Sequence, residues 1–99
     1  MSVLIVQSMP AGFDTDTYDQ ISAKARVNAE PPKGMIFHAL GTSDRGQVIV
    51  DVWESEEAFD DFREGRLNPA MESIVGSEAF AAMPTPERQF YGVHNIMNS

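Results

Sequence analysis

A four-residue turn signal between two apolar runs constrains the fold of this chain most. Residues 34–42 and 47–54 are rich in β-branched and aromatic side chains, and Ser43-Asp44-Arg45-Gly46 separates them. Such a pattern is typical of a β-hairpin whose loop is the pair Asp44-Arg45. With that loop, His38 pairs with Asp51 and Ile36 pairs with Trp53 on one face of the hairpin. A turn longer by one residue, or a bulge, would break this pairing.

The first third of the chain predicts one strand and one helix. Residues 2–9 contain the run Val3-Leu4-Ile5-Val6, which is typical of a strand covered on both faces. Residues 14–28 have apolar side chains at roughly helical spacing, with Asp14 or Thr15 as the N-cap. The prolines and glycine of residues 30–34 end this helix.

The second half predicts another helix and a closing strand. Ser55 is the expected N-cap of a helix whose first turn carries two glutamates. We expect Gly65 and Asn68-Pro69 to kink or interrupt it, and a further helical piece to run over residues 69–75. An irregular stretch then leads to a last strand over residues 88–97.

The resulting order, β-α-β-β-α-β, is that of the ferredoxin-like sandwich, an α+β fold. Two helices cover one face of a four-stranded antiparallel sheet of spatial order 4-1-3-2, in a single domain over residues 1–99. A chain of 99 residues buries only roughly 60–65% of its unfolded surface. Because the second sheet face is left bare, we expect a second copy of the chain to cover it, which makes a homodimer.

Charge and composition exclude several classes of partner. The net charge of −8 and the isoelectric point near 4.5 make nucleic acid and anionic membrane surfaces poor partners. The chain has no cysteine, so it has no thiolate nucleophile and no Cys-based metal site. The N-terminal apolar run is too short for a signal peptide or a membrane span, so we expect a cytoplasmic protein.

The segment from Val50 to Phe62, which reads VDVWESEEAFDDF, resembles a signature of a known family. It is similar to the antibiotic biosynthesis monooxygenase-like (ABM) branch of the dimeric α/β-barrel superfamily. The resemblance implies a dimeric α/β barrel. That superfamily includes cofactor-independent monooxygenases of aromatic polyketides, haem-degrading monooxygenases, isomerases, dehydratases and proteins without a known reaction, so the fold does not decide the chemistry.

The haem-degrading branch can be compared position by position. The pattern of that branch has a Trp shortly after the signature, where this chain has Phe62. About ten residues further on it has a haem-ligating His, whereas this chain has no histidine around Met71 and Glu72. Gln7 stands where that branch uses an Asn. Haem degradation is therefore disfavoured. Since no glycine-rich dinucleotide fingerprint is present either, we expect no bound cofactor.

His38 and Asp51 are the candidate catalytic residues. A carboxylate opposite an imidazole favours the imidazolium and orients the ring for proton transfer near neutral pH. The alternative is a surface cross-strand pair, or a histidine whose hydrogen bonds are satisfied in the dimer interface.

Five further residues are candidates for substrate binding: Trp53, His94, Tyr18, Phe62 and Gln7. An apolar pocket with aromatic walls suits a planar or polycyclic molecule. His94, on the last strand, lines the same cavity if Phe90, Gly92 and Ile96 are its neighbours, and the alternative is a solvated strand-end residue. Phe62 is explained equally well by helix burial. We expect no metal site, because the two histidines have no HxH or HExxH spacing and the carboxylates are scattered. The one combination that could converge on an ion is His38, His94 and Asp51.

Two functional hypotheses follow. The first is a homodimeric enzyme that oxygenates, cyclises or isomerises an aromatic or polyketide-like substrate by general acid–base catalysis, without a cofactor. The second is a non-catalytic homodimeric module that binds a small hydrophobic ligand or serves a structural role.

Overall fold

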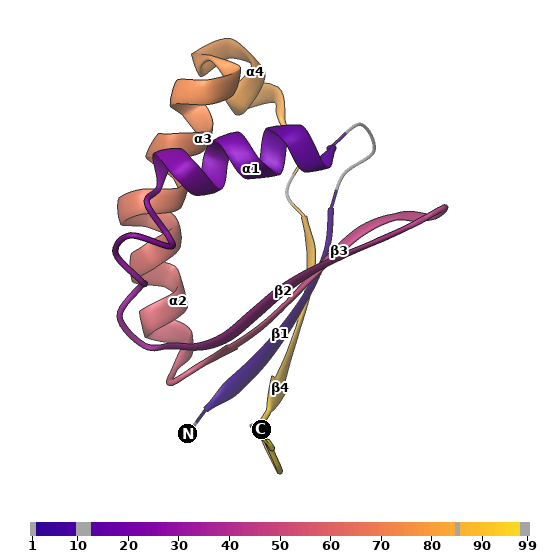
Figure 1. Ribbon diagram of the computed structural model, residues 1–99, viewed down its shortest axis with the longest axis vertical. Helices are drawn as coiled ribbons and strands as arrows, with labels where there is room; N and C mark the ends of the chain where they lie inside the picture. Colours follow the sequence, from indigo (N-terminus) through magenta and orange to yellow (C-terminus); the bar gives the residue numbers. More distant parts are fainter. Residues whose placement is uncertain (1, 10–12, 85, 98–99) are drawn as a thin grey trace.

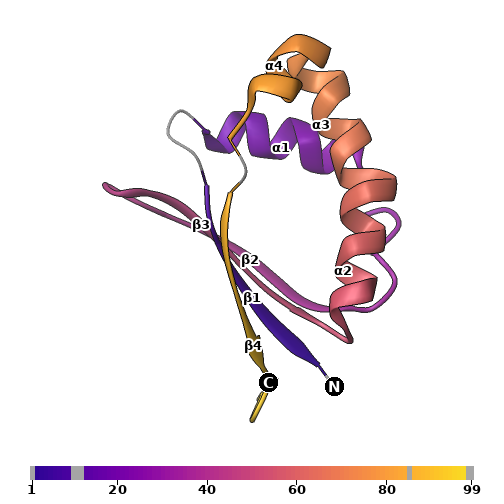
Figure 2. The same cartoon turned by 180° about the vertical axis from the view of Figure 1, so that it is seen from behind.

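The computed structural model describes residues 2–9, 13–84 and 86–97. The elements along the chain are β1 (Val3–Ser8), α1 (Thr15–Lys24), β2 (Met35–Ser43), β3 (Gly46–Trp53), α2 (Glu56–Phe62), the π-helical turn η1 (Arg63–Leu67), α3 (Asn68–Val75), α4 (Ser77–Ala82) and β4 (Glu87–Gly92). The strands form one antiparallel sheet in the order β2-β3-β1-β4. The helices lie on one side of this sheet in both views (Figures 1 and 2). The expected α+β ferredoxin-like fold is confirmed.

The β2–β3 hairpin has the expected turn and, over most of its length, the expected register. Ser43 pairs with Gly46, and His38 pairs with Asp51. The predicted pairing of Ile36 with Trp53 is wrong, because the register shifts between Met35 and Phe37 and Met35 is the partner of Trp53. The irregularity adds a residue to β2 near its start, which turns Ile36 out to solvent.

Both main helices begin at the residues that the sequence predicts. Asp14 caps α1 by accepting from the Thr17 N–H at 2.7 Å, and Ser55 caps α2 by accepting from the Ala58 N–H at 3.1 Å. α1 ends at Lys24, before the predicted boundary, and Arg26 then has a positive φ of 59°.

The segment after α2 is more helical than the sequence suggests. Instead of an interruption at Asn68-Pro69, the helix widens into η1 and continues as α3. A wider turn shifts the hydrogen-bond ladder, so Pro69 falls in the first turn of α3, where its missing N–H leaves no bond unmade. The predicted irregular stretch after Gly76 is also wrong in part, because residues 77–82 form α4.

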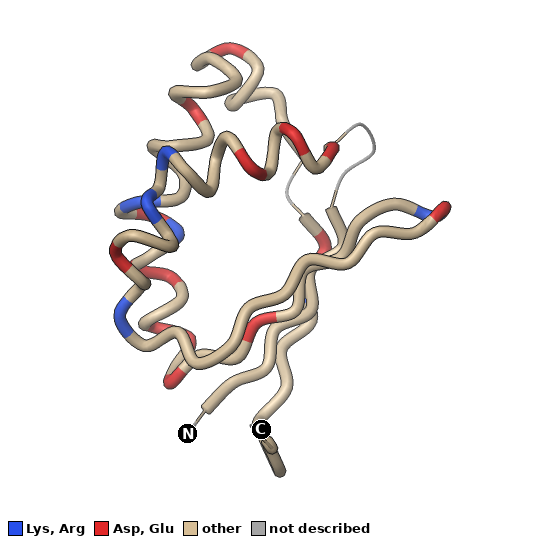
Figure 3. The backbone as a smooth tube through the Cα atoms, viewed as in Figure 1, with Lys and Arg blue, Asp and Glu red and all other residues tan. Residues whose placement is uncertain are grey.

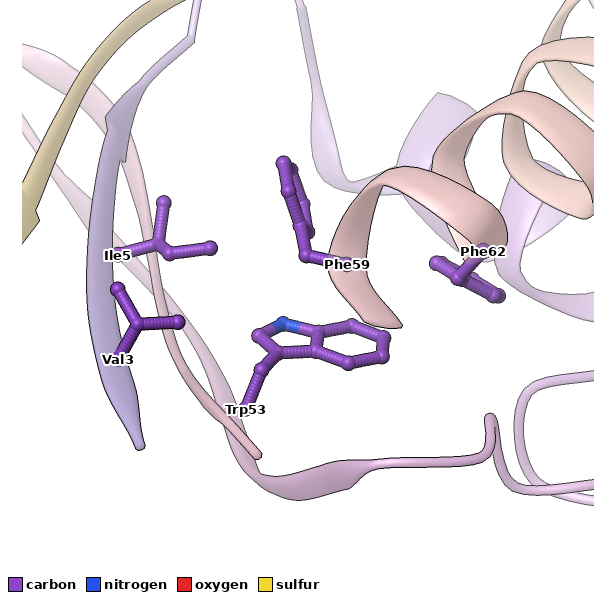
Figure 4. Packing of buried hydrophobic residues seen from close by; sticks show 5 residues of the cluster. All are labelled: Val3, Ile5, Trp53, Phe59 and Phe62. Atoms are coloured by element: carbon purple, nitrogen blue, oxygen red, sulfur yellow. The ribbon is translucent and has the colours of Figure 1, made fainter. Parts of the chain in front are cut away.

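The core lies between the sheet and α2 (Figure 4). Trp53 and Ile5 are fully buried, and the Trp53 ring meets Phe59 edge-on at 5.7 Å between centroids. Gly34, directly before β2, allows the start of α2 to lie close to the sheet. Its φ is +89°, and a Cβ there would lie 2.7 Å from the Ala58 Cβ, so a larger residue would push α2 off the sheet.

In the part of the chain that the structure describes, no helix covers the second face of the sheet (Figures 1 and 2). Phe37 and Tyr91, which point to this side, are 45% and 49% exposed. Leu4 and Val6 of β1 are half-buried, so this strand is fully covered on one face only.

The last strand is shorter than predicted. β4 ends at Gly92, and the Val93 N–H then donates to the Ser2 carbonyl at 3.0 Å. The prediction that the strand reaches residue 97 and carries His94 is therefore wrong. Residues 93–97 instead border a hollow of about 530 Å³ on the bare face, together with Leu4, Phe37, Val50 and Val52.

Most charged residues lie along the helices and the segments that join them (Figure 3). The acidic residues of α2 and its flanks are exposed, as expected for a solvated helix face. Within the described residues, no helix is long and apolar enough to cross a membrane.

Candidate active site

The hairpin register brings an imidazole against a buried carboxylate. His38 lies on β2 and Asp51 lies opposite it on β3, and the His38 Nδ1 is 2.5 Å from the Asp51 Oδ1. Asp51 is 3% exposed. A carboxylate this deep needs hydrogen-bond donors on its oxygens, because an unpaired buried charge is costly.

Trp53 supplies a second donor to Asp51. The indole Nε1–H donates to the Asp51 Oδ2 at 3.3 Å, so each carboxylate oxygen has one partner. Trp53 itself is fully buried in the core and is absent from the residues that line the cavity described below. Its place is therefore beneath the carboxylate, which it orients, and away from the pocket rim.

Tyr18 extends this chain of hydrogen bonds from α1. Its hydroxyl bonds the His38 Nε2, and the two ring planes are nearly parallel, 8° apart. Burial raises the pKa of Tyr18, and the negative charges of Asp51 and Asp19 raise it further. The phenol stays protonated at neutral pH, so with a neutral imidazole it donates to Nε2, and Nδ1 then carries the imidazole proton toward Asp51.

These groups border a small apolar cavity between the sheet and the helices. Its volume is about 70 Å³, which is smaller than the roughly 150 Å³ cavity that accepts benzene in other proteins. A polycyclic molecule therefore enters only if wall side chains move. The lining residues are Gln7, Met9, Phe13, Tyr18, Ile21, Ser22, Val27, Met35, His38, Ile49, Asp51, Phe59, Phe62, Leu67, Met71, Pro86 and Arg88.

A second polar pair lies on the other strands of the sheet. Gln7 of β1 is 6% exposed and pairs in register with Arg88 of β4. The Arg88 Nε donates to the Gln7 Oε1 at 2.8 Å, and the guanidinium lies 5.6 Å from the centre of the Phe59 ring. Burial lowers the pKa of Arg88, and the nearby positive Arg63 lowers it further, whereas Asp60 acts in the opposite direction.

Most predicted site residues therefore meet at one cavity. His38, Asp51, Tyr18, Phe62 and Gln7 all line it. His94 does not, because β4 ends before it and its segment lies exposed along the bare sheet face. Within residues 2–9, 13–84 and 86–97, no group of three His, Cys, Asp or Glu side chains is arranged to hold a metal ion.

Arg88 is the charged residue of the cavity that the sequence analysis did not predict. Its position directly across from Gln7 depends on the pairing of β1 with β4, the first and last strands of the sheet. The sequence does contain one signal for it, which is the alternation of side chains along a strand. Arg88 and Phe90 of β4 lie on the side of the sheet that faces the helices, and Gln89 and Tyr91 lie on the other side.

Comparison with solved structures places this architecture among known proteins. SnoaB, a cofactor-independent oxygenase from Streptomyces nogalater, superposes with a TM-score of 0.64 at 16% identity, over 99% of this chain and 98% of that chain. A candidate antibiotic biosynthesis monooxygenase from Nitrosomonas europaea has a TM-score of 0.64 at 13% identity, over 96% and 100%. The chain has the ABM-like fold. The sequence matches no protein-family model and no curated protein.

A haem-degrading protein shares the ABM-like fold as well. Rv3592 from Mycobacterium tuberculosis has a TM-score of 0.57 at 19% identity, over 99% of this chain and 100% of that chain. Neither histidine is placed to ligate a haem iron in this cavity, because both ring nitrogens of His38 are already hydrogen-bonded and His94 lies outside the cavity. A histidine ligates iron through an imidazole nitrogen that has no other partner.

Proposed function

We propose that this protein is a cofactor-independent enzyme of the ABM type, in which Tyr18, His38 and Asp51 remove a proton from an aromatic or polyketide-like substrate. The observation that carries the proposal is the continuous hydrogen-bonded chain from Trp53 through Asp51 and His38 to Tyr18, which ends at an apolar cavity. Such a chain holds the imidazole in one tautomer and one orientation, as a general base requires.

In the oxygenase form of this proposal the substrate supplies the electrons. His38 Nε2 receives the Tyr18 proton while the Tyr18 oxygen takes an acidic C–H or O–H proton from the substrate. The resulting enolate or phenolate reacts with dioxygen to give a peroxide, and the imidazolium, held by Asp51, returns the proton. Loss of water then leaves a carbonyl group. For anthrone, this sequence consumes one dioxygen and yields anthraquinone and one water.

A second function is favoured by the size of the cavity. A volume of about 70 Å³ suits a small apolar ligand more readily than a multi-ring substrate, and His38 and Asp51 at its edge are already hydrogen-bonded to each other. A homodimer that binds such a ligand without transforming it would have the same fold. Replacement of His38 or Asp51 distinguishes the two, since a binding module tolerates it.

The test is oxygen uptake with anthrone as the probe, corrected for uptake in buffer alone. We expect His38→Ala to lower the enzymatic rate by about a hundredfold or more, and Asp51→Asn to lower it by a similar factor because it removes the charge that holds the imidazolium. Arg45→Gln at the exposed hairpin tip is the control and keeps the wild-type rate. Wild-type uptake no faster than buffer, or full activity in His38→Ala, would contradict the proposal.

A further inference from the structure

We propose that Arg88 forms an anion-binding subsite at the second polar end of the cavity, so that the substrate is an apolar molecule that carries a carboxylate. This inference rests on the proposed function for the use of the cavity, and it goes beyond that function in naming the charge of the molecule bound there.

The guanidinium of Arg88 is only partly satisfied. Arginine has five N–H donors, and a single hydrogen bond, from Nε to Gln7, is found for Arg88 among the described residues. No described carboxylate lies within 4.0 Å of it, whereas the neighbouring Arg63 contacts both Asp60 and Glu64. In a chain of net charge −8, a half-buried cation without a direct carboxylate partner is a place for an anion.

The surroundings of Arg88 fix its orientation before any ligand arrives. The guanidinium carbon lies over the Phe59 ring, 5.6 Å from its centre, and Gln7 is held in the core by β1 and accepts from Nε. The terminal amino groups are thus the part of the fork that is left to bind a ligand. A planar fork held in this way matches the two oxygens of a carboxylate.

Arg88 also stands between two hollows. It lines the small cavity that holds His38 and a neighbouring hollow of about 220 Å³ that reaches Arg63, Asn68 and Phe80. The two share the wall residues Met9, Leu67, Met71, Pro86 and Arg88. Methionine side chains rearrange easily, so a shift of Met9 and Met71 joins the hollows and gives a ring system room beside the guanidinium.

The experiment compares a charged and a neutral probe of the same shape. Benzoate and benzamide are titrated into the wild-type protein by calorimetry near neutral pH. We expect benzoate to bind about tenfold more tightly than benzamide, because hydrogen bonds between charged partners are stronger than neutral ones. Arg88→Gln loses this preference, and Arg88→Lys keeps part of it because the charge remains while the fork is lost.

Arg45→Gln is the matched control, since it removes the same charge from the exposed hairpin tip and keeps the benzoate preference. Equal binding of the two probes, no binding of benzoate, or an unchanged preference in both Arg88 variants would overturn the inference. Oxygen uptake is measured on the same samples. Loss of the benzoate preference with His38-dependent uptake intact refutes the subsite alone, whereas a benzoate preference without uptake refutes the catalytic proposal alone.

Discussion

At the scale of single residues, the site depends on how Asp51 is accommodated. Its carboxylate is buried, and its two oxygens accept from His38 and Trp53. Each donor comes from an element that the fold already needs, since Trp53 is part of the core and His38 is fixed by strand register. The polar groups of the site are therefore held by the packing that stabilises the protein.

Tyr18 gives this arrangement a measurable signature at high pH. Because burial raises its pKa in the folded protein, the unfolded chain loses the phenolic proton first as the pH rises through about 10. The folded state then binds more protons than the unfolded state, and the free energy of unfolding falls with pH. The stabilising contribution is complete below the unfolded pKa and is lost as the pH rises toward the folded one.

We therefore expect wild-type stability to fall more steeply than that of Tyr18→Phe between pH 9.5 and roughly 11. Urea unfolding at half-unit steps of pH measures the two slopes. Both proteins carry the same remaining tyrosine, lysine and arginine side chains, so the difference between the curves isolates Tyr18. Parallel curves would show that burial of this phenol has no effect on its ionisation.

At the scale of elements, the start of α2 and the turn η1 decide where Phe59 and Phe62 point. Ser55 caps the free N–H groups of the first turn, and the widened turn lets the helix pass Pro69 without breaking. The two phenylalanines sit on consecutive turns, and both pack against the Trp53 ring (Figure 4). The cap thus helps to place one wall of the cavity.

Ser55→Ala tests the cap. Loss of the hydroxyl leaves the Ala58 N–H without its acceptor, and we expect the free energy of unfolding to fall by about 1 kcal/mol. Denaturant unfolding measures this change. Ser77→Ala is the control, because Ser77 is exposed in the first turn of α4 and no side-chain cap is found there, so its effect stays within about 0.5 kcal/mol. Equal effects of the two substitutions would refute the role of the cap.

At the scale of the whole molecule, the two faces of the sheet are unlike. One face is covered by helices, and the other exposes Phe37 and Tyr91 beside an apolar hollow. We propose that a second copy of the chain covers this face, because a domain of this size gains from the additional burial. The groups proposed to be catalytic lie on the helical face, so in such a dimer each subunit would keep its own His38 cavity.

Phe37→Glu tests the dimer. A carboxylate in the middle of an apolar interface has no partner there, and we expect the dissociation constant to rise by about a hundredfold or more. Sedimentation velocity at several protein concentrations measures the mass. Ser77→Glu, which adds the same charge on the helical side, keeps the dimer. A wild-type protein that sediments as a monomer at high concentration would contradict the proposal.

Local signals predicted much of the fold. The hairpin turn, the N-caps at Asp14 and Ser55 and the apolar periods depend on neighbouring residues, so the strand order and the pairing of His38 with Asp51 could be worked out from the sequence. The errors lie where a distant partner decides. Three features were not predicted: the bulge at Ile36, the helix α4 and the end of β4 before His94. Each depends on how two elements meet.

The sequence by itself therefore determined the four strands, the starts of α1 and α2, their order and the residues of the His38–Asp51 pair, because hydrogen-bond caps, turns and alternation act over a few residues. Only the tertiary structure decided that Tyr18 reaches His38, that Trp53 lies under Asp51, and that Arg88 meets Gln7 at the same cavity. The contact of Tyr18 with His38 depends on how α1 packs on the sheet, and that of Arg88 with Gln7 on the pairing of the first and last strands. Contacts of this kind are set by packing between elements far apart in the chain, which no local pattern records.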